Sequence, residues 1–411
     1  MKTEIVVVGG GPAGMMAAGT AAQNGAEVLL LEKNEQLGKK LLITGKGRCN
    51  LTNDCSIERM IENFPETGSF LYSALYTFPN HQLRNFFAEL GVPTKVERGD
   101  RVFPESDSAR DVVDALKGYL KDKGVEIRLK TAVNEILVEE GAVKGVMDRD
   151  GNSYLADKVV FTPGGASYPT TGSSGDGYEM LETVGHRIKS IKPSLVPLQA
   201  KEGWVASLEG LTLKNVEAGL YLNEEEIDSE FGELLFTDDG VSGPIVLTLS
   251  RDVVSRLGEG SLKLKIDLKP ALDEQTLDNR LQRDFEKYSR KQFKNSLGDL
   301  LPSKLIPVIV DLVSIPADKK VNQITVEERR ELMQLVKELE VTIIGTKGLR
   351  QAIVTKGGVM IDEIDPQTME SKLVSDLYLA GEVIDIDAYT GGFNLQAAFS
   401  TGYLAGINVV D

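Results

Sequence analysis

Cysteine and histidine are scarce in this sequence, which limits the chemistry that its own side chains can supply. Cys49 and Cys55 are the only cysteines, and His81 and His186 are the only histidines. Two cysteines cannot build a disulfide framework, and their spacing is not the C-x-x-C of redox motifs, so a reduced, cytoplasmic setting is expected. So few histidines exclude a His-rich site, and we expect no metal.

Long apolar runs and an excess of positive charge are missing as well. The 411 residues contain no uninterrupted apolar run of about eighteen and no basic segment before an apolar stretch, which predicts neither a membrane span nor a signal peptide. The net charge is −16. Such an acidic surface repels phosphates, so we expect a small-molecule substrate and neither nucleic acid nor membrane as a partner. The length predicts two or three domains and leaves the oligomeric state open.

Glycine, in contrast, is abundant, and it first gathers in the stretch EIVVVGGGPAGMMAAG. Ile5–Val8 is predicted to be a buried strand, and Gly9, Gly11 and Gly14 fit the pattern G-x-G-x-x-G. The pattern provides a tight turn, close backbone approach to a pyrophosphate, and a helix N-terminus that attracts phosphate. Glu32 ends the next apolar run, where an acid binds the adenosine ribose and argues against the 2′-phosphate of NADP. The opening therefore predicts a dinucleotide site, with NAD and FAD both still open.

A basic loop follows this opening. Residues 39–53 contain Lys39, Lys40, Lys46 and Arg48 but no acidic residue. In an acidic protein, such a glycine-broken loop directly after a dinucleotide fold predicts a second wall of the phosphate site.

The middle of the chain changes its pattern twice. Alternating segments at 133–138 and 142–147, a turn at 149–152 and a buried strand that ends in glycines predict an antiparallel meander in place of a crossover helix, as in FAD-binding variants of the fold. Short alternating segments from 195 to 267 indicate a β-sheet or small barrel, and 270–340 is predicted to be helical, with a capping box at Thr325 and Glu328. No second G-x-G-x-x-G with a suitable acid is found.

The end of the chain decides between NAD and FAD. LYLAG is an apolar strand, and a glycine pair and a helix from Phe393 follow it. A terminal strand, loop and helix have a use in an FAD fold. There Asp385 would bind ribityl hydroxyls, Gly391 and Gly392 would let the backbone approach the isoalloxazine, and the helix N-terminus would face the edge that becomes negative on reduction. The dinucleotide is therefore predicted to be FAD.

A resemblance to a known family covers nearly the whole chain in order. The segments TGKGRCNLTN, TPGGASYPTTGSSGDGYEML, GELLFTDDGVSGPIVLTLS and LYLAGEVIDIDAYTGGFNLQAAFSTG resemble the aminoacetone-oxidase-like, or BaiN-type, FAD-dependent oxidoreductases. The resemblance implies an α/β fold with a Rossmann-like FAD-binding domain of the glutathione-reductase or fumarate-reductase type, made from both chain ends and interrupted by a β-barrel domain and a small helical subdomain. We expect the FAD-binding domain at 1–193 and 357–411, the barrel at 194–269 and 341–356, and the helical subdomain at 270–340.

The resemblance, carried over position by position, also implies which residues contact the cofactor. The expected FAD contacts are Gly9, Gly11, Pro12, Ala13, Gly14, Glu32, Lys33, Lys40, Thr44, Gly45, Gly47, Arg48, Cys49, Asn50, Val133, Gly164, Gly165, Gly381, Glu382, Asp385, Gly391, Gly392, Asn394, Leu395 and Gln396.

The reaction itself is less well specified by the sequence. Cys49 is a candidate redox partner of the flavin, although a packed thiol is the favoured interpretation, and Tyr168, Asp176 and Tyr389 are candidate proton donors or substrate contacts. His186 is expected to be a surface or packing residue. An oxidase or reductase of a small molecule, with NADH, NADPH or a small amine as a transient electron donor, is the favoured function. A flavin-dependent RNA-modifying enzyme and a non-catalytic flavin-bound sensor are the alternatives.

Overall fold

The computed structural model describes residues 2–411, which fall into two compact units. Unit 1 comprises the chain up to Ser194 together with Gly348–Asp411, and unit 2 comprises Leu195–Lys347. We describe each unit by itself. The sequence predicted three domains with the boundaries given above, and that division stays a prediction.

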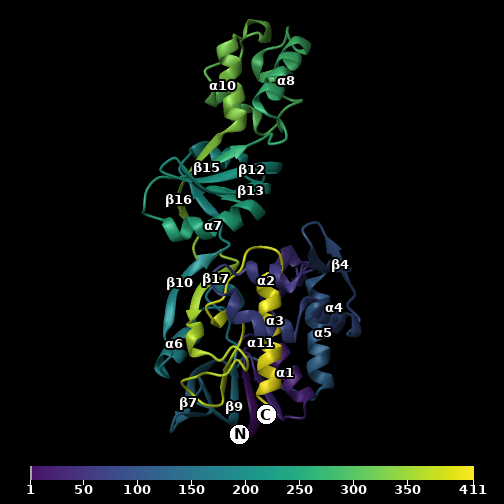
Figure 1. Ribbon diagram of the computed structural model, residues 1–411, viewed down its shortest axis with the longest axis vertical. Helices are drawn as coiled ribbons and strands as arrows, with labels where there is room; N and C mark the ends of the chain where they lie inside the picture. Colours follow the sequence, from purple (N-terminus) through teal and green to yellow (C-terminus); the bar gives the residue numbers. More distant parts are fainter. Residues whose placement is uncertain (1) are drawn as a thin grey trace. The chain divides into compact units, whose positions relative to one another are not determined.

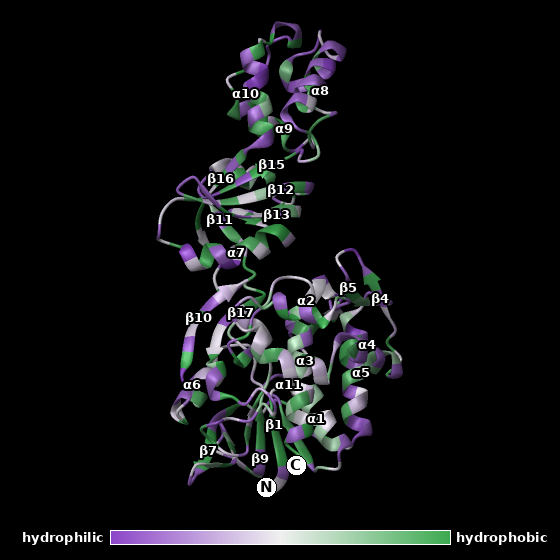
Figure 2. Cartoon of the chain, viewed as in Figure 1, coloured by the Kyte–Doolittle hydropathy of each residue, from purple (hydrophilic) through white to green (hydrophobic). Residues whose placement is uncertain are grey.

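A seven-stranded sheet forms the centre of unit 1 (Figure 1). Its order is β6 (Glu126–Arg128), β2 (Val28–Leu31), β1 (Lys2–Val8), β9 (Ser153–Phe161), β8 (Ala142–Asp148) and β7 (Val133–Glu139). The strand β18 (Leu377–Leu379) pairs in parallel with the end of β9. The last strand of the chain therefore joins the sheet that the first part of the chain forms. β7, β8 and β9 form the predicted antiparallel meander. The central strands are apolar, as Figure 2 shows for β1 and β9, because both faces of the sheet are covered.

Two helices from opposite ends of the chain pack closely in unit 1. They are α1 (Pro12–Gln23) and α11 (Phe393–Asn408). A Cβ atom at Gly402 would lie 2.3 Å from the carbonyl oxygen of Ala13, and one at Gly406 would lie 2.6 Å from that of Ala17. Only small residues permit this approach, which brings the C-terminal helix against the helix of the glycine motif.

The remaining elements of unit 1 surround this sheet. They are α2 (Ile57–Glu62), α3 (Tyr72–Thr77), α4 (Asn80–Glu89), α5 (Ala109–Asp122) and α6 (Asp176–Thr183), the 3₁₀ helices η1 (Leu41–Gly47), η2 (Gly68–Leu71), η3 (Pro169–Thr171), η7 (Ile361–Glu363) and η8 (Gly381–Val383), a small sheet of β3 (Thr52–Asn53), β5 (Arg101–Pro104) and β4 (Thr94–Glu97), and the antiparallel pair β10 (Ile188–Ser194) and β17 (Val354–Val359).

Unit 2 is a closed barrel that carries helices. The barrel order is β11 (Leu198–Ala200), β14 (Gly240–Ser242), β13 (Glu225–Phe236), β12 (Thr212–Leu222), β15 (Leu262–Asp267) and β16 (Leu339–Thr346). Its helices are α7 (Pro244–Arg256), α8 (Glu274–Lys287), α9 (Ile306–Leu312) and α10 (Val326–Lys337), with η4 (Gly203–Leu208), η5 (Phe293–Asn295) and η6 (Val321–Gln323). The predicted capping box begins α10, because Thr325 accepts from the Glu328 amide while the Glu328 carboxylate accepts from the Thr325 amide. Barrel and helices share one apolar core.

Candidate cofactor site

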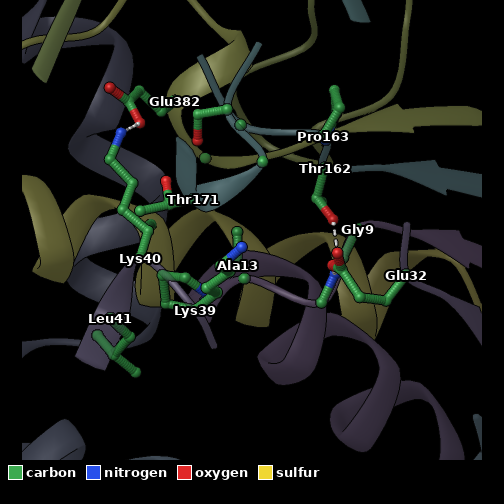
Figure 3. Close-up of a pocket in the computed structure, with 18 of the residues that line it drawn as sticks. Gly9, Ala13, Glu32, Lys39, Lys40, Leu41, Thr162, Pro163, Thr171 and Glu382 are labelled. Carbon is green, nitrogen blue, oxygen red and sulfur yellow. Dashed lines mark hydrogen bonds and ion pairs between the residues drawn. The ribbon is translucent and has the colours of Figure 1, made fainter. Parts of the chain in front are cut away.

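The glycine turn between β1 and α1 is packed too tightly for any larger residue at two positions. Gly9 has φ of +101°, and a Cβ atom there would lie 2.2 Å from the Thr162 carbonyl oxygen. A Cβ atom at Gly14 would lie 1.9 Å from the carbonyl oxygen of Gly9. The Thr162 hydroxyl donates to the carbonyl oxygens of Val8 (2.7 Å) and Gly9 (3.2 Å), which ties the end of β9 to the turn (Figure 3). This arrangement fixes where α1 begins.

The N-terminus of α1 is open to a ligand. Gly11 is its N-cap, no side chain caps the helix, and its first turn contains no acidic residue. A Cβ atom at Gly11 would meet nothing within 4 Å. Because the first N–H groups of a helix lack intrahelical partners, they and the helix dipole favour a phosphate at this place.

Glu32 lies at the other side of the turn with a nearly buried carboxylate. Its Oε2 accepts from the Gly10 amide (2.6 Å), and its Oε1 accepts from the Asn34 amide and from the Asn34 side chain (2.7 Å each). An ionised carboxylate accepts about four hydrogen bonds. The three present bonds orient the group and leave it able to accept one more, such as that from a ribose hydroxyl.

The ion pair of Lys40 and Glu382 also lines the cavity. The two side chains point toward each other in Figure 3. The Lys40 ammonium donates to Glu382 Oε2 (2.7 Å) and to the Ser167 hydroxyl (2.6 Å). Glu382 Oε1 accepts from the Ser167 hydroxyl and from the Thr355 amide (2.8 Å each). Burial opposes ionisation of Glu382, but the Lys40 charge and these hydrogen bonds outweigh it and lower the pKa of Glu382. The carboxylate thereby joins η8, β17 and the loop after β9.

These groups surround one cavity in unit 1, whose empty space, including its open mouth, is about 1340 Å³. Many of the predicted FAD contacts line it: Gly9, Gly11, Pro12, Ala13, Glu32, Lys33, Lys40, Thr44, Val133, Gly164, Gly381, Glu382, Asn394 and Leu395. The structure thus brings together residues from both ends of the chain.

Other predicted contacts lie outside this lining: Gly14, Gly45, Gly47, Arg48, Cys49, Asn50, Gly165, Asp385, Gly391, Gly392 and Gln396. Asp385 is buried, where its Oδ1 accepts from the Gly357 amide (3.1 Å) and its Oδ2 pairs with Lys189 (2.9 Å). The Gln396 amide donates to the Phe78 carbonyl oxygen and to Ser400. Their roles as FAD contacts, like those of the whole predicted set, stay predictions.

The basic loop is partly neutralised by acids. Within the loop, Arg48 pairs with Asp107 (2.6 Å) and with Glu97 while lying over the Phe103 ring, and before the loop Lys33 pairs with Asp176 (2.9 Å). Lys40 and Arg48 are thus paired with acids, whereas Lys39 also lines the cavity, and the second wall of the phosphate site stays a prediction.

The candidate reactive residues are not gathered at one place. Asp176 lines the cavity, and there its carboxylate is bound by Lys33. Tyr168, with φ of +54°, is 39 % exposed and does not line the cavity. The Tyr389 amide donates to the Asn63 carbonyl oxygen (3.1 Å). Cys49 is buried in the core of unit 1, as expected for a packed thiol.

The two thiols should react very differently. Burial raises the pKa of Cys49 to about 12; it also raises the pKa of Cys55, but that thiol is only half-buried and can be reached by a reagent. Because the thiolate is the reactive form, iodoacetamide at pH 8 should modify Cys55 in the folded protein and leave Cys49 unmodified until urea unfolds the chain. Mass spectrometry of the Cys55→Ser and Cys49→Ser variants checks this. Rapid alkylation of folded Cys55→Ser would contradict it.

Several lining residues were not named individually from the sequence, although four of them lie in the TPGGASYPTTGSSGDGYEML segment that carries the family resemblance. Thr162, Thr171, Ser173 and Met180 line the cavity, as do Ala397 and Ala398 on α11. In the FTPGG segment, the threonine at the end of a buried strand could have indicated a residue of the cavity lining. The alanines read in sequence as ordinary packing residues.

His186 is a packing residue with two polar partners. Its Nδ1 lies 3.1 Å from Glu363 Oε2, and its Nε2 lies 2.9 Å from the Ser371 hydroxyl. The Ser371 hydroxyl also accepts from the amides of Leu373 and Val374, and the ring is fully buried. This Ser–His–Glu arrangement therefore joins three segments of unit 1.

The stability of the protein should fall in mild acid because of His186. Burial lowers its pKa, although Glu363 acts in the opposite direction. Below the ordinary histidine pKa of about 6.5, the unfolded chain then binds more protons than the folded one, so the free energy of unfolding decreases as the pH falls. Urea midpoints at pH 8 and pH 5 should differ less for His186→Gln than for the parent. The exposed His81 supplies the control His81→Gln, and an equal difference in all three proteins would contradict the assignment.

The residues present fit FAD. An uncapped helix N-terminus suits the pyrophosphate, the oriented Glu32 suits the adenosine ribose, and the cavity continues from there to the C-terminal segment. A nicotinamide site would have no evident need for that segment.

A parallel sheet with this glycine turn, completed by a strand and helix from the other end of the chain, defines an FAD-binding protein of the Rossmann type. The chain belongs to the family described as HI0933-like protein Rossmann domain, whose model matches residues 3–408.

Proteins with related sequences or structures agree with this class. The chain is 33 % identical to the 3-dehydro-bile acid delta(4,6)-reductase of Clostridium scindens, with 98 % of each chain covered. It is 30 % identical to the ribosomal RNA dihydrouridine synthase of Escherichia coli, covering 98 % of this chain and 96 % of that relative. A flavocytochrome c3 fumarate reductase shares the fold, with a TM-score of 0.55 and 18 % identity over 100 % of this chain and 78 % of the other.

The protein is therefore an FAD-dependent oxidoreductase, and the predicted family, fold class and cofactor are confirmed. Among residues 2–411, no helix is long and apolar enough to cross a membrane. The relationship to an RNA-modifying relative leaves the expected absence of a nucleic-acid partner a prediction.

Proposed function

We propose that this enzyme reduces a carbon–carbon double bond conjugated to a carbonyl group in a small molecule, with NADH or NADPH as the electron donor. The full-length similarity to a reductase of 3-dehydro bile acids carries the proposal. The dihydrouridine synthase supports the same chemistry, since dihydrouridine is uridine with a reduced carbon–carbon bond next to a carbonyl.

The chain's own residues would bind and orient the reactants. When bound, FAD supplies two-electron redox chemistry. The α1 N-terminus and Glu32 would hold its adenosine pyrophosphate, and the Lys40–Glu382 pair would fix the shape of the cavity farther along. The net reaction consumes NAD(P)H, a proton and the double bond, and yields NAD(P)⁺ and the saturated carbonyl compound.

A small molecule is favoured over RNA by charge. The net charge of −16 would repel a polyanion, and steering of RNA depends on the opposite sign. Because no second dinucleotide motif is found in the sequence, the nicotinamide donor is expected to bind transiently.

The test is an anaerobic panel with the FAD-loaded protein. NADH, NADPH and aminoacetone are each mixed with it, and bleaching of the flavin absorbance is followed. A 3-oxo-4-ene steroid and a uridine-containing RNA are then added to the reduced protein. Bleaching by NADH or NADPH and reoxidation by the steroid support the proposal. Bleaching by aminoacetone alone would support an amine oxidase instead, and reoxidation by RNA alone would support RNA modification.

A further inference from the structure

Two lysines on adjacent strands of unit 1 converge on one glutamate. Lys189 lies on β10 and Lys356 on β17, which pair in antiparallel fashion (Figure 1). The Lys356 ammonium lies 2.5 Å from Glu66 Oε1, and the Lys189 ammonium lies 3.1 Å from Glu66 Oε2. Each oxygen of a single carboxylate thus takes one lysine.

The charges at this place balance only when Glu66 is counted. Asp385 is the fixed counter-ion of Lys189, since its carboxylate is buried and also accepts from the Gly357 amide. Without Glu66, two ammonium groups would face one carboxylate. The Lys356 side chain is only 15 % exposed, and Glu66 is its ion-pair partner. A mostly buried ammonium needs an anion beside it.

Glu66 is the one exchangeable member of this cluster. It lies between α2 and η2, far in sequence from both strands, and its side chain is 47 % exposed. Hydrogen bonds from the two lysines lower the pKa of Glu66 to about 2, so it is ionised at neutral pH. If another carboxylate takes the place of Glu66, Lys356 keeps an anion beside it, so such an exchange leaves no buried charge unpaired.

No member of the cluster lines the cofactor cavity, but Lys356 and Asp385 stand close in sequence to residues that do. Val354 and Ile386 line the cavity. Alternate residues of a strand share a face, so Lys356 projects from β17 on the same side as Val354. Asp385 directly precedes Ile386. A Cβ atom at Gly357 would lie 2.3 Å from the Ser190 carbonyl oxygen, so the two strands pack closely at this position.

We propose that Lys189 and Lys356 form a subsite for a carboxylate group of the substrate, and that Glu66 occupies this subsite until the substrate displaces it. This inference rests on the proposed reduction of a small molecule and adds its substrate class, a carbonyl-conjugated alkene that carries a carboxylate. A substrate carboxylate offers the two lysines the same two oxygen atoms and the same negative charge as the Glu66 carboxylate. A chain of RNA phosphates would also bring further negative charge to an acidic protein.

The test is binding of a matched acid and ester to the oxidised FAD-loaded protein without any electron donor. The probes are 3-oxo-4-cholenoic acid and its methyl ester, and the Kd comes from the change in flavin absorbance. The parent should bind the acid more tightly than the ester. Lys356→Met should weaken binding of the acid about tenfold, as for loss of one charge-assisted hydrogen bond, with the ester unaffected. Glu66→Gln should tighten binding of the acid several-fold.

Two further variants make the result specific. Lys356→Arg keeps the charge and should restore most of the preference for the acid, which a merely structural role of Lys356 would not explain. Lys121→Met removes an exposed lysine of α5 and should change neither Kd. Equal affinity of acid and ester in the parent, no binding of the acid, or weaker binding in Glu66→Gln would overturn the subsite. The subsite would also be overturned if Glu66→Gln increased the affinity for a uridine-containing RNA more than the affinity for the acid.

The subsite and the proposed function fail separately. If the acid binds as expected but NAD(P)H never reduces it, the proposed reaction is wrong and the subsite stands. If the steroid is reduced with no dependence on Glu66 or Lys356, the reaction stands and the subsite is wrong.

Discussion

Gly11→Val should give a folded protein that no longer retains FAD. Gly11 has φ of −81°, which any residue adopts, and a Cβ atom there meets nothing within 4 Å. The fold therefore tolerates a side chain at this position. The valine side chain would enter the space in front of the N–H groups at the start of α1, where we place the pyrophosphate. Loss of two charge-assisted hydrogen bonds, each about 1.5–3 kcal/mol, lowers the FAD affinity about a hundredfold or more.

Matched glycine variants separate this effect from misfolding. Gly118→Val, at another open position in α5, should keep both fold and FAD. Gly14→Val should not fold, since its Cβ atom would lie 1.9 Å from the Gly9 carbonyl oxygen. Titration with FAD and circular dichroism distinguish the three outcomes. If Gly11→Val holds FAD as tightly as Gly118→Val does, the phosphates do not lie at the α1 N-terminus.

Glu382→Ala should damage both the stability of unit 1 and its affinity for FAD. The substitution leaves Lys40, Ser167 and the Thr355 amide without their acceptor beside the cavity. Loss of a hydrogen-bonded charge of this kind costs about 2–3 kcal/mol, and we expect a Tm several degrees lower and weaker FAD binding.

A double-mutant cycle tests whether the pair acts as a unit. Removing both charges in Lys40→Met/Glu382→Ala should be less harmful than the sum of the single changes, because neither charge is then left alone, with a coupling of about 1–3 kcal/mol. Calorimetry with and without FAD provides the measurement. Additive effects would show that Lys40 and Glu382 act independently and that the pair does not position the cavity.

The local elements of unit 1 could be predicted because their signals are local. An apolar strand, a G-x-G-x-x-G turn and an acid at the end of the next strand specify β1, α1 and Glu32 within about thirty residues of sequence. The helical spacing of Val112, Leu116 and Tyr119 in the sequence places them on one face of α5, and all three are buried. The capping box at Thr325 is likewise a short-range pattern.

Asp385 shows where sequence reasoning stopped. It stands in a loop after an apolar strand, which is the place for a ribityl ligand. Whether its carboxylate turns to the cavity depends on Lys189 and Gly357, which are distant in sequence. The same holds for Lys40, which the sequence pattern assigned to a phosphate wall and which the structure pairs with Glu382, more than three hundred residues away.

By itself, the sequence determined the family, the dinucleotide motif and the identity of the cofactor, because these depend on contiguous patterns of apolar, glycine and acidic residues. Tertiary structure alone decided which charges are free and which are neutralised. The partners of Lys33, Lys40, Lys356 and Asp385 lie on other elements, and a hydrogen bond requires atoms within about 3 Å, a condition that only the packing of those elements can meet.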